Sequence, residues 1–250
     1  MSKDKHILEN EFYKNVPKAR RINPFFRESF NLLYDAHMSL DAFGSSAKVL
    51  NIYSSADLSS QREEFFKEMF FSDAEYYGID FWRDQFIPQG HTALDQPGDE
   101  RHRLPFEDNS FDVVVTTKVI MEHVTIPFTV VDELYRVLKP GGKAFVIAPH
   151  VRRQHQVPYD FFRYTEYGLK YLFSSSGFSK CVTTPTGGFM ALVGYYAYFF
   201  QRGLNVPKFV EKMFDLIHYW LIEPICYGLD RLDNGYGRDM TLYFMVRAEK

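Results

Sequence analysis

The chain is poor in cysteine and has no strong excess of either charge. Its 250 residues include only two cysteines, Cys181 and Cys226, and no CxxC or Cys/His spacing indicates a zinc site. We therefore expect no metal. The net charge of −3 argues against a polyanionic partner such as nucleic acid. The polar start of the chain lacks the apolar run of a signal peptide, which predicts a cytoplasmic protein with reduced thiols.

Aromatic residues, in contrast, are abundant. The 25 phenylalanines and 17 tyrosines indicate a deep pocket or an apolar interface, because such rings line most ligand cavities. A chain of 250 residues is long enough to bury one large core, or one core with a cap. We therefore expect a single domain.

The stretch from Leu104 to His150 predicts a strand, a helix and a second strand. Residues Phe111 to Thr117 form a short Val-rich run, which is typical of a strand buried on both faces of a parallel sheet. Pro127 suits the first turn of a helix, and apolar residues then recur at helical spacing. The Pro-Gly-Gly run at 140–142 ends that helix, and Lys143 to Ala148 is the second strand. This right-handed βαβ unit predicts an α/β fold.

Two blocks of this stretch, LPFEDNSFDVVV and ELYRVLKPGGKAFVIAP, resemble the fourth-strand and fifth-strand blocks of the Rossmann-like S-adenosylmethionine-dependent methyltransferases, in their type 11 branch. Weaker resemblance extends from about Lys48 to Phe178. The resemblance implies a mostly parallel, seven-stranded twisted sheet with helices on both faces. It also implies S-adenosylmethionine as cofactor and a small-molecule, glycan or lipid-linked methyl acceptor.

On this fold the chain divides into a helical lead-in (1–47), a core sheet (48–184 and 238–250) and an α-helical cap insertion (187–237). The remaining strands are expected at Lys48–Tyr53, Glu75–Asp80, Phe178–Thr184 and, antiparallel, Thr241–Arg247. Further helices are expected from Pro24 to about His37, after a capping box at Ser60 and Glu63, and from Thr165 to Gly177.

The turn after the first strand departs from the family pattern. Members carry D-x-G-x-G-x-G here, because glycine lets the backbone approach the cofactor. This chain has Asn51, Tyr53 and Ser55 at the corresponding positions and none of the expected glycines. The loop therefore takes another course, or the cofactor binds weakly, or it does not bind.

Other positions keep the family's cofactor-binding chemistry. Asp80 ends the second strand, where a carboxylate can accept both ribose hydroxyls, although a loop-capping aspartate would look the same. Asp99 or Glu100 matches the carboxylate that meets the adenine amino group, or else forms a solvated acidic turn. The resemblance also places Thr117 and His123 beside the cofactor, while a packed structural histidine is the alternative for His123.

The segment HQVPYDFFRYT resembles one that faces the substrate in relatives. His155 and Asp160 are candidates for a general base and the group that orients it. Arg163 is a candidate for holding an anionic substrate group, and His150 and Tyr159 for substrate contact. The simpler alternative is that Asp160 and Arg163, three residues apart, only brace a loop.

The insertion contains two apolar helical stretches, Phe189–Phe200 and Phe209–Leu221, both too short to span a bilayer. They could form a lid over an apolar acceptor, a homodimer interface or a membrane-surface anchor. Few basic residues flank them, so peripheral membrane contact is the least favoured use. Two functions remain for the whole chain. It is a methyltransferase, or it is an inactive methyltransferase-like binding or scaffold protein, which the missing glycines favour.

Overall fold

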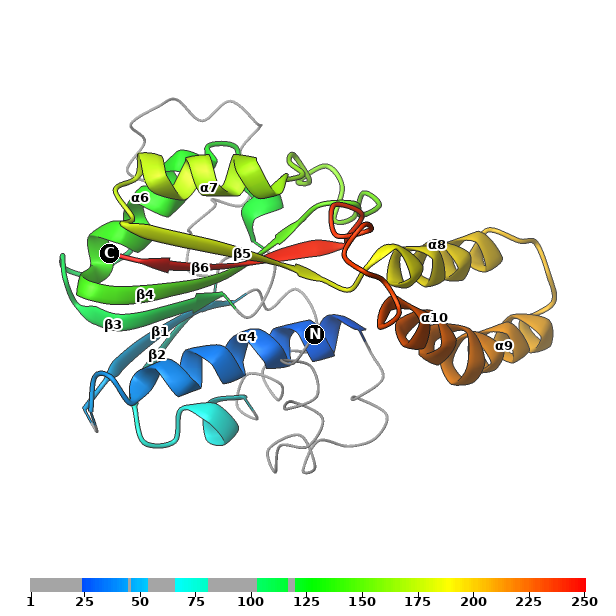
Figure 1. The fold of residues 1–250 in the computed structure, drawn as a ribbon, viewed down its shortest axis with the longest axis horizontal. Helices are drawn as coiled ribbons and strands as arrows, with labels where there is room; N and C mark the ends of the chain where they lie inside the picture. Colours follow the sequence, from blue (N-terminus) through cyan, green and yellow to red (C-terminus); the bar gives the residue numbers. More distant parts are fainter. Residues whose placement is uncertain (1–23, 45, 54–65, 81–102, 117–119) are drawn as a thin grey trace.

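The computed structural model describes residues 24–44, 46–53, 66–80, 103–116 and 120–250. These residues form a mixed sheet with helices on both faces, and a separate group of helices stands beyond one end of the sheet (Figure 1). The strands are β1 (Lys48–Tyr53), β2 (Glu75–Asp80), β3 (Phe111–Thr116), β4 (Leu138–Pro149), β5 (Lys180–Thr186) and β6 (Tyr243–Glu249). The helices around the sheet are α4 (Pro24–Leu40), η2 (Met121–His123), α6 (Pro127–Val137) and α7 (Glu166–Ser175).

The strand order is β2-β1-β3-β4-β6-β5. Strands β1 to β4 pair in parallel, and β6 runs antiparallel to both of its neighbours, as predicted. The part of the chain that the structure describes has six strands, whereas we expected seven. Residues 81–102, between β2 and β3 in the sequence, lie outside the described part.

The order of the strands reverses at β1, which lies between β2 and β3. In the β1–β2 register Tyr53 is opposite Asp80, and in the β1–β3 register Ile52 is opposite Thr116. The carboxyl ends of three parallel strands therefore meet at one edge of the sheet. Open α/β sheets bind their ligands outside such a reversal point.

Each face of the sheet carries its own apolar core. On one face α6 and α7 pack on the strands through fully buried side chains such as Leu134 and Phe173. On the other face lie α4 and residues 66–70, with Phe30 and Phe70 in edge-to-face contact at 4.9 Å between ring centroids. The alternation within β3, where Val114 faces one core and Val115 the other, explains the Val-rich run in the sequence.

Two predicted boundaries are wrong by a few residues. Leu138 has an extended backbone and pairs with Phe111, so β4 begins where we expected the last turn of the helix. The next pairs, beginning with Val113 and Lys143, are out of step with the first, so the intervening residues form an irregularity. Similarly, β5 begins at Lys180 and not at Phe178, whose side chain is buried in the core instead. The predicted N-cap of α7 is confirmed: the Thr165 side chain accepts a hydrogen bond from the Gly168 N–H.

The helices of the insertion form a bundle beyond the carboxyl ends of β4 and β5 (Figure 1). They are α8 (Phe189–Arg202), α9 (Lys208–Ile217), the π-helical turn η3 (His218–Ile222) and α10 (Glu223–Asp230). We refer to these four elements as the cap. The sequence predicted two helices, but the second continues beyond Leu221 through η3 into α10.

A carboxylate from the end of the cap fixes its beginning. Asp230 accepts hydrogen bonds of 2.8–2.9 Å from the backbone N–H groups of Gly188, Met190 and Ala191, the first donors of α8. Gly194 lets α10 approach α8 closely, because an added β-carbon would lie 3.3 Å from Cys226. Each described helix, those of the cap included, is too short or too polar to cross a membrane.

Candidate active site

The edge of the sheet where β1, β2 and β3 end is the expected cofactor side. Asp80 is the last residue of β2 and lies beside Tyr53 in the strand register. Two residues before Tyr53 on β1, Asn51 is fully buried, and its side-chain amide donates a 2.7 Å hydrogen bond to the Tyr76 hydroxyl. Ser55, Asp99, Glu100 and Thr117, together with the capping box, lie outside the described residues.

Beyond β3 the short helix η2 carries a buried Glu-His pair. Glu122 is fully buried, and His123 is 3% exposed. The Nδ1 of His123 lies within hydrogen-bonding distance of the Tyr159 carbonyl oxygen, and its Nε2 is 3.7 Å from Glu122 Oε1. Burial lowers the pKa of His123, while the neighbouring Glu122 carboxylate acts in the opposite direction. His123 is thus packed against the loop that follows β4.

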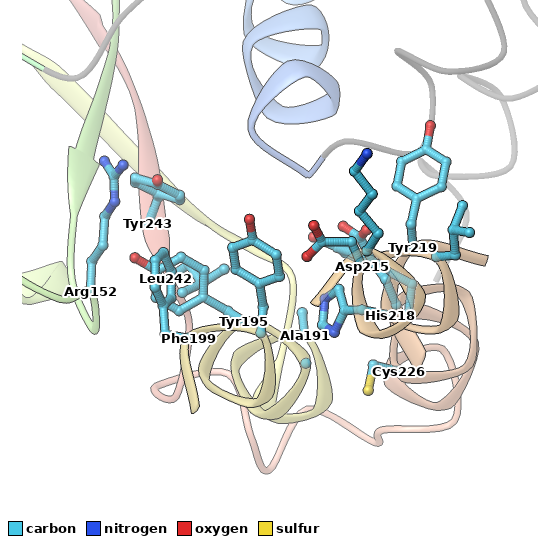
Figure 2. A pocket seen from close by; sticks show the side chains of 16 residues that line it. Arg152, Ala191, Tyr195, Phe199, Asp215, His218, Tyr219, Cys226, Leu242 and Tyr243 are labelled. Carbon is cyan, nitrogen blue, oxygen red and sulfur yellow. The ribbon is translucent and has the colours of Figure 1, made fainter. Parts of the chain in front are cut away.

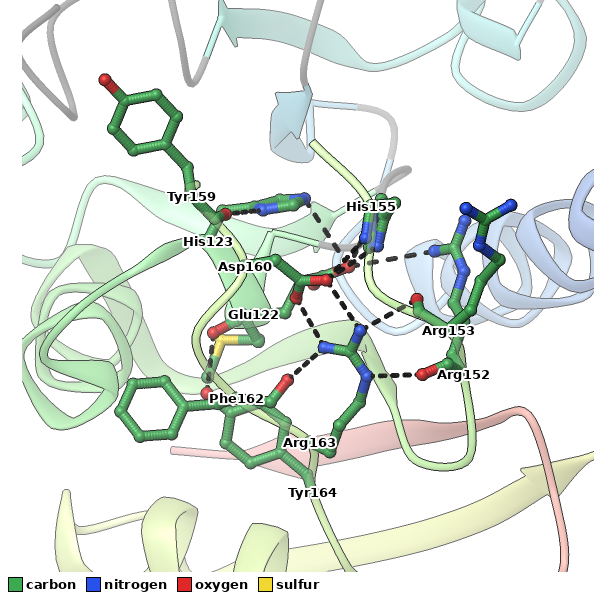
Figure 3. Close-up of polar contacts among 11 residues, drawn as sticks. Glu122, His123, Arg152, Arg153, His155, Tyr159, Asp160, Phe162, Arg163 and Tyr164 are labelled. Atoms are coloured by element: carbon green, nitrogen blue, oxygen red, sulfur yellow. Dashed lines mark hydrogen bonds and ion pairs between the residues drawn. The ribbon is translucent and has the colours of Figure 1, made fainter. Parts of the chain in front are cut away.

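That loop brings the predicted base and its partner to the same place. Figure 3 shows His155 between two carboxylates, with Nε2 3.2 Å from Glu122 Oε1 and Nδ1 3.3 Å from Asp160 Oδ2. The His155 backbone N–H also donates to Asp160 Oδ2 at 2.8 Å. Neither oxygen of Glu122 accepts a hydrogen bond from the described residues, which leaves an acceptor facing the imidazole. We call Glu122, His155 and Asp160 the acid–base cluster.

Asp160 is held in turn by Arg163. The guanidinium binds both carboxylate oxygens, at 2.6 and 2.8 Å, and its other N–H groups donate to the carbonyls of Arg152, Arg153 and Phe162. Burial acts to raise the pKa of Asp160, but the hydrogen bonds from Arg163 and from His155 bring it down to about 2. All five Arg163 donors are therefore engaged within the loop, which agrees with the bracing alternative for this arginine.

His150 and Tyr159, predicted to contact substrate, serve the loop in different ways. The two ring nitrogens of His150 lie 2.8 Å from the Tyr164 carbonyl and 2.9 Å from the Asp239 carbonyl, so this side chain ties β4 to the segment before β6. Tyr159 contributes its carbonyl oxygen to His123, and its ring points away from the acid–base cluster in Figure 3. Tyr164 closes the loop onto η2 by donating a 2.7 Å hydrogen bond to the Met121 carbonyl.

One group of side chains in the described residues could hold a metal ion. The ligand atoms of Glu122, His123 and His155 all lie within 4.8 Å of one another. The guanidinium of Arg152, however, is 3.9 Å from the same Glu122 oxygen and already supplies positive charge there.

A cavity of about 690 Å³ separates the cap from the sheet (Figure 2). Three residues of the core line it, Arg152 from the loop after β4 and Leu242 and Tyr243 at the start of β6. The cap contributes mainly apolar and aromatic side chains: Ala191, Tyr195, Tyr198, Phe199, Leu216, Tyr219, Cys226 and Tyr227. Glu122, His155 and Asp160 do not line the cavity, and Arg152, which does, lies 3.9 Å from Glu122.

The cap side of the cavity carries most of its titratable groups. Glu223 is 8% exposed, and burial raises the pKa of its carboxyl to about 7. Burial also lowers the pKa of His218, which Asp215 partly counteracts. Asp215 is itself 3.8 Å from Arg202.

The sequence did not show the positions of three side chains that shape this site. Glu122 and His123 resemble a Glu-His pair common at this point in the family, but only the fold shows that Glu122 faces His155. Arg152 stands in a polar run with no distinguishing spacing. Glu223 is a single acidic residue in the apolar run HYWLIEPIC, and because glutamate is seldom buried, its burial follows only from the structure.

Residues 57–146, which include β2, β3, η2, α6 and most of β4, match a family model described as a methyltransferase domain. Over these residues the chain is similar to the methyltransferase domain family. The match includes the end of β2 at Asp80 and the Glu122–His123 pair. Members of this family use S-adenosylmethionine as methyl donor, as the resemblance implied.

The chain is also similar to parts of two curated methyltransferases. A demethylmenaquinone methyltransferase of Anoxybacillus flavithermus is 35% identical over 101 residues, which cover 36% of this chain and 42% of that protein. A ubiquinone/menaquinone biosynthesis C-methyltransferase of a Ruegeria species is 44% identical over 55 residues, 22% of either chain. The chain thus spans less than half the length of these two relatives.

Among solved structures, an S-adenosylmethionine-dependent methyltransferase of Archaeoglobus fulgidus aligns over 89% of this chain and 94% of its own, at 15% identity and a TM-score of 0.48.

Proposed function

We propose that this chain is an S-adenosylmethionine-dependent methyltransferase whose small-molecule acceptor binds in the cavity between the cap and the sheet. The observation that carries the proposal is the position of Arg152, which lines that cavity and lies 3.9 Å from Glu122 of the acid–base cluster. An acceptor beside Arg152 would therefore lie one side chain away from the acid–base cluster. The relatives named for demethylmenaquinone support a small-molecule acceptor.

The nucleoside half of the cofactor would bind beside the end of β2. Asp80 is the last residue of that strand, next to the point where the strand order reverses, and a carboxylate at such a strand end can accept hydrogen bonds from both ribose hydroxyls. When bound, S-adenosylmethionine supplies an electrophilic methyl group. The chain's contribution is to align the acceptor with that group and to exclude water, which accounts for much of the rate in such transfers.

His155 would remove the proton of a hydroxyl acceptor. Its Nδ1 lies 3.3 Å from Asp160 and its Nε2 3.2 Å from Glu122, so the imidazole is placed to be stabilised when it takes up a proton. A proton received at Nε2 makes an imidazolium between two carboxylates, and each of them stabilises the charge. Arg163 keeps Asp160 ionised and in place, as a positioning residue.

The test follows a labelled methyl group. Wild-type protein, His155→Ala and the surface variant Glu68→Gln are incubated with methyl-labelled S-adenosylmethionine and a small-molecule extract, and label is measured in the low-mass fraction. We expect transfer by wild type and Glu68→Gln, and at least a hundredfold slower transfer by His155→Ala, the usual size of a general-base contribution. Binding of S-adenosylmethionine without any transfer would instead support the scaffold function.

A further inference from the structure

Arg152 is a cation that lines the cavity together with aromatic side chains such as Tyr195 and Tyr243. Its side chain is 20% exposed, and the guanidinium carbon lies 5.2 Å from the centre of the Tyr243 ring. Burial acts to lower the pKa of Arg152, but the phenols of Tyr243 and Tyr195 and the Glu122 carboxylate raise it overall, so the group remains charged. A planar cation stacked on a ring keeps its orientation, which suits it to recognition.

The charge of Arg152 is incompletely matched by the protein. Within the described part of the chain its carboxylate neighbour is Glu122, at 3.9 Å, and the same Glu122 oxygen is closer to both histidines, at 3.2 Å from His155 and 3.7 Å from His123. The Nε of Arg152 donates to no acceptor within the described residues. A buried guanidinium usually has carboxylate or phosphate partners in a two-pronged arrangement, so this site lacks an anion.

The cavity is also asymmetric in charge. Arg152 and Tyr243 lie on the sheet side, whereas Asp215 and His218 lie on the cap side, with Tyr195 between them (Figure 2). Glu223 also belongs to the cap side, and Lys212 precedes Asp215 by one turn of α9. An anionic ligand is attracted by Arg152 on the sheet side, whereas on the cap side Asp215 and Glu223 offset the positive charge of Lys212.

We infer that the cavity binds an organic anion with an apolar, ring-sized body, and that Arg152 holds its anionic group next to the acid–base cluster. The inference that this anion is the methyl acceptor rests on the proposed function. The inference that the cavity binds such an anion does not. The apolar body would pack against Tyr195, Tyr198 and Leu216, which line the cavity. Arg152 is then the residue that determines specificity for charge.

A matched pair of probes tests the inference without any methyl transfer. 2-Naphthoate and its methyl ester have the same ring system and differ in the anionic group alone. Their binding is measured by calorimetry to wild type, Arg152→Met, Arg152→Lys and Arg153→Met. Arg153 is the control, because it is an exposed arginine one residue along the chain that stacks on Phe199 and does not line the cavity.

We expect wild type to bind the carboxylate more tightly than the ester. Arg152→Met should weaken binding of the carboxylate about tenfold or more, as for loss of a charge-assisted hydrogen bond, and should change binding of the ester less than about twofold. Arg152→Lys should fall between the two, and Arg153→Met should match wild type. Unchanged melting temperatures establish that the variants fold. The inference is overturned by equal loss of both probes in Arg152→Met, by equal loss in Arg153→Met, or by absence of carboxylate binding to wild type. Because S-adenosylmethionine takes no part, these results are independent of whether methyl transfer occurs.

Discussion

The buried carboxyl of Glu223 should make the stability of the cap depend on pH. Its pKa is raised by burial from about 4.5 to about 7, so the folded protein keeps a proton that the unfolded chain has already lost. The contribution of this group to the free energy of unfolding is fully present below pH 4.5, decreases as the pH rises from 4.5 to 7 and is lost above pH 7. Replacing Glu223 with glutamine removes the charge and with it this loss.

The size of the effect follows from the pKa difference. Each pKa unit corresponds to about 1.4 kcal/mol, and water in the cavity reduces the full value, so we expect about 2 kcal/mol at pH 8. At pH 5 the carboxyl is neutral in the folded protein but already largely ionised in the unfolded chain, so the difference between the variant and wild type should be about a quarter of its value at pH 8. At pH 8 Glu223→Gln should be the more stable protein.

Urea unfolding at pH 5, 6, 7 and 8, followed by tryptophan fluorescence, measures this difference directly, because Trp220 lies on the cap. Glu68→Gln is the control, since Glu68 is exposed and should show no pH-dependent difference. A stability difference between Glu223→Gln and wild type that is constant over this pH range would refute the argument from burial.

Three further substitutions test the strand ends and the loop. Asp80→Ala should weaken binding of S-adenosylhomocysteine by about 1.5–3 kcal/mol in calorimetry, as for a hydrogen bond to a charged group, and an unchanged affinity would remove Asp80 from the site. Tyr53→Gly should strengthen binding of S-adenosylmethionine more than that of adenosine, because a β-carbon at this turn crowds the amino-acid portion of the cofactor; weaker binding would make Tyr53 a contact residue. Asp160→Asn should cost about 1–3 kcal/mol of unfolding free energy at pH 7, and less as the pH falls from 4 toward 2, since the lowered pKa of Asp160 stabilises the fold only while the carboxylate is ionised; a cost independent of pH would contradict this.

The central elements of the fold could be predicted because each of their sequences is compatible with only one kind of secondary structure. A Val-rich run such as 113–115 must be buried on both faces, and Pro127 with the apolar stripe after it fits a helix start. The βαβ arrangement then follows from connection rules alone. The end of α6 was harder, since the extended backbone of Leu138 is imposed by pairing with Phe111 and not by its own sequence.

The site was predictable only in part, because its geometry depends on contacts distant in sequence. His155 and Asp160 are five residues apart and their proximity was foreseen, whereas Glu122 reaches them only because η2 packs under the loop. The same holds for Arg152, whose position in the cavity depends on helices that begin 37 residues later, at Phe189. The use of the cap as a lid or as a homodimer interface remains a prediction.

Calorimetric titration of the wild-type chain with S-adenosylmethionine tests the account most directly, because the family's glycine-rich turn is replaced here by Tyr53 and its neighbours. The account predicts saturable binding at one site per chain, competed by S-adenosylhomocysteine. Absence of binding by wild type and by Tyr53→Gly alike would contradict it, and Asp80 and His155 would then have structural roles only.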